Sequence, residues 1–279
     1  GKSMMRFRQL PLLGVLLCHV AFTYAATEWD CNVKSGTFVK SFDCKLASLL
    51  SVAGTLSIDG YQNDSAPLVT VRAAPSKSHF MIQANDALTL KYLNLTGGDV
   101  SYSGGVIYAD GNCELIIIKS ALTYNRALSG GAVYGQNGIN MQIVDTDFVS
   151  NTATSSTGGG GGIYIFGSTS VLNVTRGRFR LNKAAIYGGS VICYLANCIF
   201  NISVIEENTA AYGGGLYQSG GFVTFKNSAV AHNVASQGAG GMYIFSATIN
   251  LADTKVEGNN TEANHAGAIY LSGTTTTLT

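Results

Sequence analysis

Apolar and polar positions recur along most of this chain with a period of about 26 residues. One recurring element is a Gly-Gly pair followed by a small residue, an aliphatic residue and Tyr. Its copies lie 25 to 30 residues apart and begin at Gly104, Gly130, Gly160, Gly188, Gly213, Ala239 and Ala266. A second element, apolar-x-x-Asn-x-Ala, falls between them, with its Asn at Asn125, Asn151, Asn182, Asn208, Asn233 and Asn259.

Alignment on those Asn residues gives columns of one chemical type. The column three positions earlier is apolar and holds Leu122, Phe148, Phe179, Ile205, Val230 and Val256. The column eight positions earlier holds Ile117, Ile143, Val174, Phe200, Phe225 and Leu251. The column ten positions earlier holds Leu115, Met141, Leu172, Cys198, Val223 and Ile249. The last two columns alternate with polar positions, which is the period of a β-strand.

A repeat of this length with three short strand-like pieces predicts one coil of a parallel β-helix. We expect an all-β fold, a single right-handed parallel β-helix of about seven or more rungs, in which equivalent strands lie about 4.8 Å apart. Apolar columns then fill the interior, the Gly-Gly pair permits positive φ or close backbone approach at a corner, and the Asn side chains form a hydrogen-bonded ladder. Leucine-rich repeats would need a Leu-rich consensus, and propeller blades need about 40 residues.

The repeats resemble those of a known family. The sequence Gly-Gly-Ala-Val-Tyr at 130–134, with Phe148 three positions before Asn151, resembles the paired repeats of chlamydial polymorphic outer-membrane proteins. More broadly, residues 80–279 are similar to right-handed β-helix proteins of the pectin-lyase-like fold. This resemblance implies an exported passenger whose membrane anchor follows the repeats. Such repeats occur on adhesins, surface proteins and carbohydrate enzymes, so the resemblance is specific for fold and weak for activity.

The remaining chain divides into two segments. Arg6 and Arg8 precede the apolar run 10–21, and Ala25 follows at a small-residue site, which is the order of a secretory signal peptide. An uncleaved anchor is the alternative. We therefore expect a signal peptide within 1–25, an N-terminal cap and irregular early rungs over 26–79, and the β-helix over 80–279. In the early rungs, 56–58, 68–71 and 80–82 are expected strands, and Leu88, Leu90 and Leu95 fit the apolar columns.

Composition and cysteine spacing narrow the function classes. Charged residues make up 12% of the chain and the net charge is +1, so a nucleic-acid binder, which needs a basic field, is excluded. Export makes disulfides plausible, and we expect Cys31 to pair with Cys44. Cys193 and Cys198 form either a local bridge or, because Cys198 lies in a core column, free thiols. No spacing indicates a metal site, and no cofactor is expected.

The tyrosines of the repeat are the main candidate site. Each follows an aliphatic residue that faces inward, so alternation predicts an outward ladder of Tyr108, Tyr134, Tyr164, Tyr217, Tyr243 and Tyr270. A row of aromatic rings on a flat wall suits sugar rings. The competing interpretation is that the rings stack on one another and stabilise the sheet.

Carboxylates are the second candidate. Asp145 and Asp147 lie two positions apart on an expected strand, a pair that could perform glycoside hydrolysis or bind Ca²⁺ for lyase chemistry. The alignment, however, places Arg176 and Arg178 in the same columns one rung later and Lys119 one rung before Asp145. That order predicts ion pairs between neighbouring coils, and no catalytic residue is assigned.

Sequons allow glycosylation in a eukaryotic host at Asn63, Asn94, Asn173 and Asn201, whereas Asn259 is a ladder residue expected to stay unmodified. The expected function is an exported structural and adhesive interaction module, secreted or on the cell surface, or in the outer membrane of a bacterium. Its expected partners are polysaccharides, surface glycans or a host or cell-surface protein. Membrane attachment is expected only through a region beyond Thr279. The alternative is a polysaccharide lyase or glycoside hydrolase of the same fold.

Overall fold

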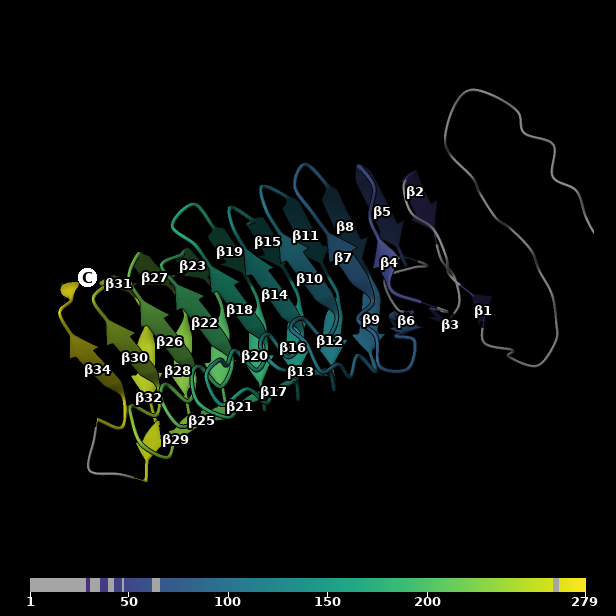
Figure 1. Cartoon of the computed structure of the whole chain (residues 1–279). Coiled ribbons are helices and arrows are strands. Elements are labelled where there is room, and N and C mark those ends of the chain that lie inside the picture. Colours follow the sequence, from purple (N-terminus) through teal and green to yellow (C-terminus); the bar gives the residue numbers. More distant parts are fainter. Residues whose placement is uncertain (1–28, 31–35, 40–42, 47, 62–65, 263–265) are drawn as a thin grey trace, which may run out of the picture.

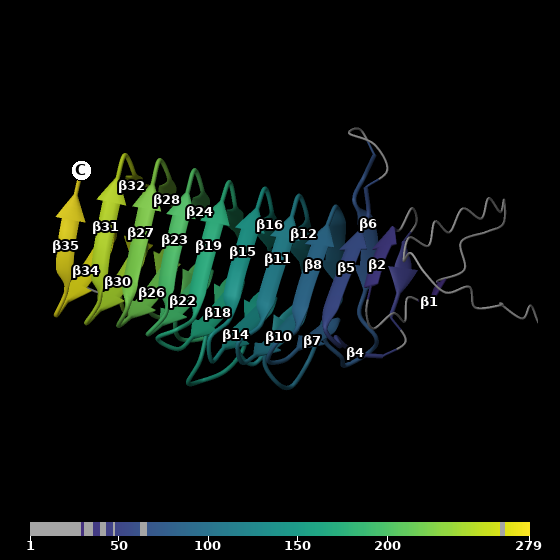
Figure 2. The same cartoon turned by 90° about the horizontal axis from the view of Figure 1, so that it is seen from above.

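The computed structural model describes residues 29–30, 36–39, 43–46, 48–61, 66–262 and 266–279. Over these residues the chain forms a single parallel β-solenoid of about nine turns that contains no helix. Figure 1 shows the coils stacked side by side along one axis. Figure 2 shows the same stack from above, with β35 at its C-terminal end. The predicted all-β solenoid is confirmed.

Each complete coil passes through four walls, and the first two carry the longer strands. The first wall consists of β4 (Leu50–Ser51), β7 (Phe80–Ile82), β10 (Ile107–Asp110), β14 (Val133–Gln136), β18 (Ile163–Phe166), β22 (Val191–Tyr194), β26 (Leu216–Ser219), β30 (Met242–Phe245) and β34 (Ile269–Ser272). The second wall consists of β2 (Gly36–Val39), β5 (Thr55–Asp59), β8 (Ala87–Lys91), β11 (Glu114–Ile118), β15 (Asn140–Val144), β19 (Val171–Thr175), β23 (Asn197–Asn201), β27 (Phe222–Lys226), β31 (Thr248–Ala252) and β35 (Thr275–Leu278).

The third and fourth walls carry shorter strands. The third wall consists of β1 (Trp29–Asp30), β3 (Cys44–Lys45), β6 (Val69–Arg72), β9 (Leu93–Thr96), β12 (Ala121–Thr123), β16 (Asp147–Val149), β20 (Arg178–Arg180), β24 (Val204–Glu206), β28 (Ala229–Ala231) and β32 (Lys255–Glu257). The fourth wall consists of β13 (Arg126–Ala127), β17 (Thr152–Ala153), β21 (Lys183–Ala184), β25 (Thr209–Ala210), β29 (Val234–Ala235) and β33 (Asn260–Thr261).

The fourth wall differs from the three strands predicted per repeat. It follows the ladder Asn directly and contains the Ala column of the second repeat element. Ala153, Ala184 and Ala210 form a small buried cluster of their own, apart from the main core. A two-residue strand is too short to show a period, so the sequence pattern carried no signal for it.

The predicted columns lie directly over one another. Phe148 of β16 pairs in register with Phe179 of β20, which pairs with Ile205 of β24, and all three are fully buried. The rings of Phe148 and Phe179 stack at 4.8 Å with an interplanar angle of 12°. Stacking of equal side chains in every coil fills the interior at the density of a protein core. The solenoid is therefore held together by one continuous apolar core.

The early coils join the same walls. Leu88 and Leu90 of β8 pair with Leu115 and Ile117, and Leu95 pairs with Leu122, as the column assignments predict. The expected strands at 56–58, 68–71 and 80–82 correspond to β5, β6 and β7. Within the described residues, segment 26–79 thus contributes strands to the walls of the later coils.

The two glycines of each repeat meet different requirements. Gly160 has φ 67°, a left-handed conformation in which a side chain is strained. Gly161 lies against the next coil, and a Cβ atom there would overlap the carbonyl oxygen of Gly189 and the backbone of Lys183. The first glycine therefore serves the turn and the second serves the close approach of two coils.

Replacing Gly161 by alanine is expected to lower the free energy of unfolding by about 1–3 kcal/mol, because the methyl group must push two backbones apart. The matched control is Gly162→Ala, whose column already holds Ala132 in the coil before and Ser190 in the coil after. The control is expected to change stability by less than about 0.5 kcal/mol. Urea denaturation followed by circular dichroism measures both. Equal destabilisation of the two variants would show that coil contact is not the cause.

The cysteines of the described chain have two environments. Cys193 of β22 and Cys198 of β23 form a disulfide across the corner between the first and second walls, and both are fully buried. The local bridge is thus the correct one of the two alternatives. Cys113 is a buried free thiol. Cys31 lies outside the described residues, so its pairing with Cys44 stays a prediction.

Candidate functional site

The repeat tyrosines lie in one row on the outer face of the first wall. Tyr108 pairs in register with Tyr134 and Tyr134 with Tyr164, while the aliphatic residue before each tyrosine is buried. Ile192 occupies the same position in β22, and Tyr217, Tyr243 and Tyr270 continue the row. Each of these tyrosines is half-buried. The alternation that predicted an outward row is therefore present.

The tyrosine rings of the row stack face to face on one another. Tyr108 and Tyr134 stack at 5.4 Å with an interplanar angle of 10°, and Tyr134 and Tyr164 stack at 5.0 Å and 18°. Tyr217, Tyr243 and Tyr270 stack likewise. A stacked ring offers a partner its edge and its hydroxyl group. Face-on sugar stacking inside the row is thus blocked, and hydrogen bonding from its edge is open.

Tyrosines from the loop before the first wall widen the row. The ring of Tyr187 lies 4.6 Å from that of Tyr217, and the ring of Tyr212 lies 5.5 Å from that of Tyr243. Tyr212 also donates a hydrogen bond to Gln237 Oε1 at 2.6 Å. Both tyrosines stand one position before a Gly-Gly pair, in a column that is Ser, Gly or His in other coils, so no repeat pattern identified them.

A second outward column runs beside the tyrosine row, two positions later in each strand. It includes Phe166, Tyr194 and Phe245, of which Tyr194 and Phe245 are 40% and 45% exposed. The rings of Phe166 and Tyr194 lie 5.6 Å apart. The residue types of this second column vary from coil to coil, so the repeat pattern predicted the tyrosine row but not this column. We call the tyrosine row and this second column together the aromatic wall.

The phenol groups of Tyr134 and Tyr217 stay uncharged at neutral pH. Burial raises the pKa of Tyr134 to about 12, and burial likewise raises that of Tyr217 to about 12. Tyr134 donates a hydrogen bond to Gln136 Oε1 at 2.8 Å, and Gln136 Nε2 donates to the hydroxyl oxygen of Tyr108 at 3.3 Å. The edge of the row is therefore a line of neutral hydroxyl groups.

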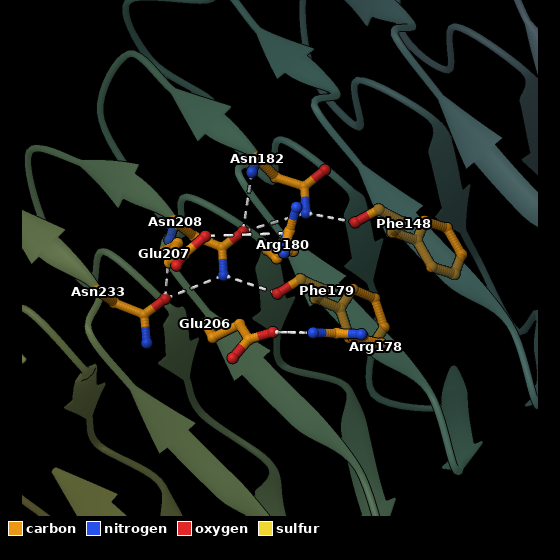
Figure 3. Close-up of polar contacts among 9 residues, drawn as sticks. All are labelled: Phe148, Arg178, Phe179, Arg180, Asn182, Glu206, Glu207, Asn208 and Asn233. Carbon is orange, nitrogen blue, oxygen red and sulfur yellow. Dashed lines mark hydrogen bonds and ion pairs between the residues drawn. The ribbon is translucent and has the colours of Figure 1, made fainter.

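The predicted Asn ladder runs inside the corner between the third and fourth walls. Asn182 Nδ2 donates to Phe148 O at 2.8 Å and to Asn208 Oδ1 at 3.0 Å, and its backbone N–H donates to the same oxygen (Figure 3). The other ladder residues repeat this arrangement. Where Gly98 replaces Asn, its N–H donates to Asn125 Oδ1. The ladder is a structural device, since its polar groups are occupied within the fold.

The carboxylate pair is placed differently from the prediction. Asp147 lies on β16, but Asp145 has φ 49° and lies at the corner between β15 and β16, so the two do not share a strand. Lys119 and Arg176 occupy the same left-handed corner, with φ 45° and 51°. Tyr92 and Ile202 occupy the same corner in other coils with φ 53° and 51°, so the turn sets this conformation whatever the residue type, and strand alternation cannot reveal it.

The predicted charge pairing between coils is confirmed for Asp145 with Arg176, whereas Arg178 forms its ion pair with Glu206 of the next coil in place of Asp147. Arg176 Nε and Nη2 donate to the two carboxylate oxygens of Asp145 at 2.5 and 2.8 Å, which holds the pKa of that carboxyl below its usual value. Arg178, in register with Asp147, binds Glu206 at 2.8 Å (Figure 3). With both oxygens bound by a guanidinium group, Asp145 is poorly suited to act as a nucleophile or base.

The sequon residues lie on outer faces where they are described. Asn94, Asn173 and Asn201 are half-buried outward residues of β9, β19 and β23. Asn259 Nδ2 donates to Val230 O, as a ladder residue does. Asn63 lies outside the described residues. Glycosylation at these positions stays a prediction.

Two kinds of feature are absent from the described part of the chain. It holds no group of three or more His, Cys, Asp or Glu side chains placed to bind a metal ion. It also contains no helix that is long and apolar enough to cross a membrane. A surface depression on the early coils is lined by Asp59, Tyr61, Lys91, Tyr92 and Ile118.

Comparison with known proteins adds no family to this description. No protein-family model matches the chain, and no curated protein matches it either. The aromatic wall is therefore interpreted from its own geometry.

Proposed function

We propose that the chain is an exported structural and adhesive interaction module whose aromatic wall contacts glycans. The observation that carries this proposal is the continuous array of half-exposed aromatic side chains on the first wall, from β10 to β34. Exposed aromatic surface of this extent on one face is typical of a binding site.

Export and surface location rest on the sequence. The basic-then-apolar segment 6–25 has the order of a signal peptide, and the repeats resemble those of chlamydial outer-membrane proteins of the pectin-lyase-like fold. A solenoid of stacked coils extends far from its point of attachment and presents long walls to its surroundings. These features support a protein that acts outside the cell.

The shape of the aromatic wall favours a narrow ligand. From Tyr108 to Tyr270 the wall spans six strand spacings, about 29 Å, and its strands are about 13 Å wide, which gives about 400 Å². A standard protein–protein interface buries about 800 Å² on each partner. A narrow polymer chain fits this strip, whereas a globular partner would need more surface.

The chemistry of the wall favours an uncharged ligand. Among the outward positions of the first-wall strands from β10 to β34, Asp110 is the one charged residue. The neutral hydroxyl groups of the tyrosine row can donate and accept hydrogen bonds. A neutral polysaccharide matches a strip of hydroxyl groups and apolar ring edges.

The double variant Tyr217→Phe/Tyr243→Phe is expected to weaken glycan binding about thirtyfold, because two hydrogen bonds of about 1 kcal/mol each are lost while ring packing is kept. Isothermal titration calorimetry with cellohexaose, mannohexaose and xylohexaose measures the effect. The control is Asn173→Ala on the second wall, which should bind like the wild type. If the double variant binds every hexaose as tightly as the wild type, the aromatic wall is not the binding surface.

A further inference from the structure

The second column of the aromatic wall contains a gap. Tyr194, Ser219 and Phe245 pair in register on β22, β26 and β30, so a small side chain stands between two exposed rings. Ser219 is half-buried, while Tyr194 and Phe245 are 40% and 45% exposed. The first column has no such gap at this level, since Tyr217 fills it. We call this feature the Ser219 slot.

The slot has the size of one ring. Neighbouring strands lie about 4.8 Å apart, so Tyr194 and Phe245 stand about 10 Å apart along the axis. A ring above Ser219 would lie about 5 Å from each of them. That spacing equals the one that the wall already uses, since the ring centroids of Tyr217, Tyr243 and Tyr270 lie 5.6 and 4.5 Å apart.

The surroundings of the slot are neutral, with a polar floor. Ser219 carries a hydroxyl group that lies close enough to the Tyr217 hydroxyl group to influence its pKa, and a serine hydroxyl can both donate and accept hydrogen bonds. Leu195, 42% exposed, lies against Gly220 at one side. Aromatic rings on two sides and hydroxyl groups below match a pyranose, whose C–H faces are apolar and whose rim carries hydroxyl groups.

We propose that the Ser219 slot binds one uncharged pyranose unit of a glycan whose chain crosses the aromatic wall at this level, so that the faces of the sugar ring meet Tyr194 and Phe245. This inference rests on the proposed function and adds the ligand class and the anchoring position. A sugar is favoured over an aromatic side chain of a protein partner, because the strip is too narrow for a standard protein interface and the slot floor offers hydroxyl groups. The slot also provides the face-on contact that the stacked tyrosine row cannot.

The test fills the slot. Ser219→Phe completes the column between Tyr194 and Phe245 and is expected to weaken the binding of cellohexaose or mannohexaose at least about tenfold. The matched control is Thr224→Phe, which adds the same ring at a half-buried outward position of β27, in the second wall of the same coil, and should leave binding unchanged. Phe245→Ala, at a 45% exposed position, removes one side of the slot without filling it and should give a similar loss. Thermal unfolding confirms that each variant is folded.

The possible results distinguish the proposal for the Ser219 slot from the proposal that the aromatic wall binds glycans. If Ser219→Phe and Phe245→Ala bind the hexaoses like the wild type while Tyr217→Phe/Tyr243→Phe binds them weakly, the slot is wrong and the proposed function stands. If no hexaose binds the wild type, the proposed glycan function fails and the slot assignment fails with it. A further arm uses the peptide Gly-Gly-Phe-Gly-Gly-Ser. Binding of this peptide alone, abolished by Ser219→Phe, would overturn the glycan assignment in favour of a protein ring.

Discussion

Replacement of Asn182 by alanine will lower the free energy of unfolding by about 4 kcal/mol, because four buried hydrogen bonds end on this amide. Its Nδ2 donates to Phe148 O and Asn208 Oδ1, and its Oδ1 accepts from the backbone N–H and from Nδ2 of Asn151. The variant leaves the Phe148 carbonyl and the Asn151 N–H buried without these partners. Buried polar groups without partners cost more than exposed ones, since no water replaces the lost contact.

The matched control for this prediction is Asn173→Ala, in the same coil. Asn173 is an outward, half-exposed residue of β19, so its loss should change stability by less than about 0.5 kcal/mol. Guanidinium denaturation of both variants gives the comparison. A change below about 1 kcal/mol for Asn182→Ala would mean that the ladder hydrogen bonds merely replace equivalent bonds to water.

Acidification from pH 6.5 to pH 4 will cost the protein about 3 kcal/mol of stability through His79 alone. His79 is fully buried, its Nε2 donates to Val71 O at 2.9 Å, and its Nδ1 is a buried atom without a hydrogen-bond partner. Burial, the largest influence, lowers the pKa of this imidazole from 6.5 to about 4. The folded protein therefore resists a proton that the unfolded chain accepts.

The direction of the effect follows from proton binding. Between pH 6.5 and 4 the unfolded state carries more protons than the folded state, so stability falls as pH falls through this window and changes no further through His79 below it. Denaturation curves at several pH values, measured for the wild type and for His79→Gln, isolate the contribution, because the other titrating groups are common to both. A stability difference between the two proteins that stays constant across this window would refute the assignment.

Much of the fold can be predicted from the sequence because a solenoid converts sequence period directly into position. Phe148, Phe179 and Ile205 lie over one another because the same environment recurs in every coil, and this constraint leaves a visible column. The same holds for the Asn ladder. These features need only local repetition, which an alignment of the chain with itself reveals.

The rest depends on features that do not repeat or have no period. The left-handed corner that holds Asp145 is fixed by backbone geometry, and Lys119, Asp145 and Arg176 share it without sharing a residue type. Tyrosine occurs in the Tyr187 column in only two coils, and the Ser219 slot occurs in one. Comparison between coils therefore could not identify either feature. The disulfide of Cys193 and Cys198 was one of two alternatives, because a cysteine in a core column is compatible with either state. Candidate binding features thus lie mainly where the repeat is irregular.

The Asn ladder has one more property, which concerns direction. From Asn125 to Asn233 each side-chain amide donates to the ladder Asn of the coil after, and from Asn151 to Asn259 each accepts from the ladder Asn of the coil before. The amides linked in this way are oriented alike along the axis. Aligned dipoles in a low-dielectric interior polarise one another and strengthen each bond. The Asn ladder therefore behaves as a cooperative electrostatic chain. Replacing a ladder residue at mid-length should cost more stability than replacing one near either end of the ladder.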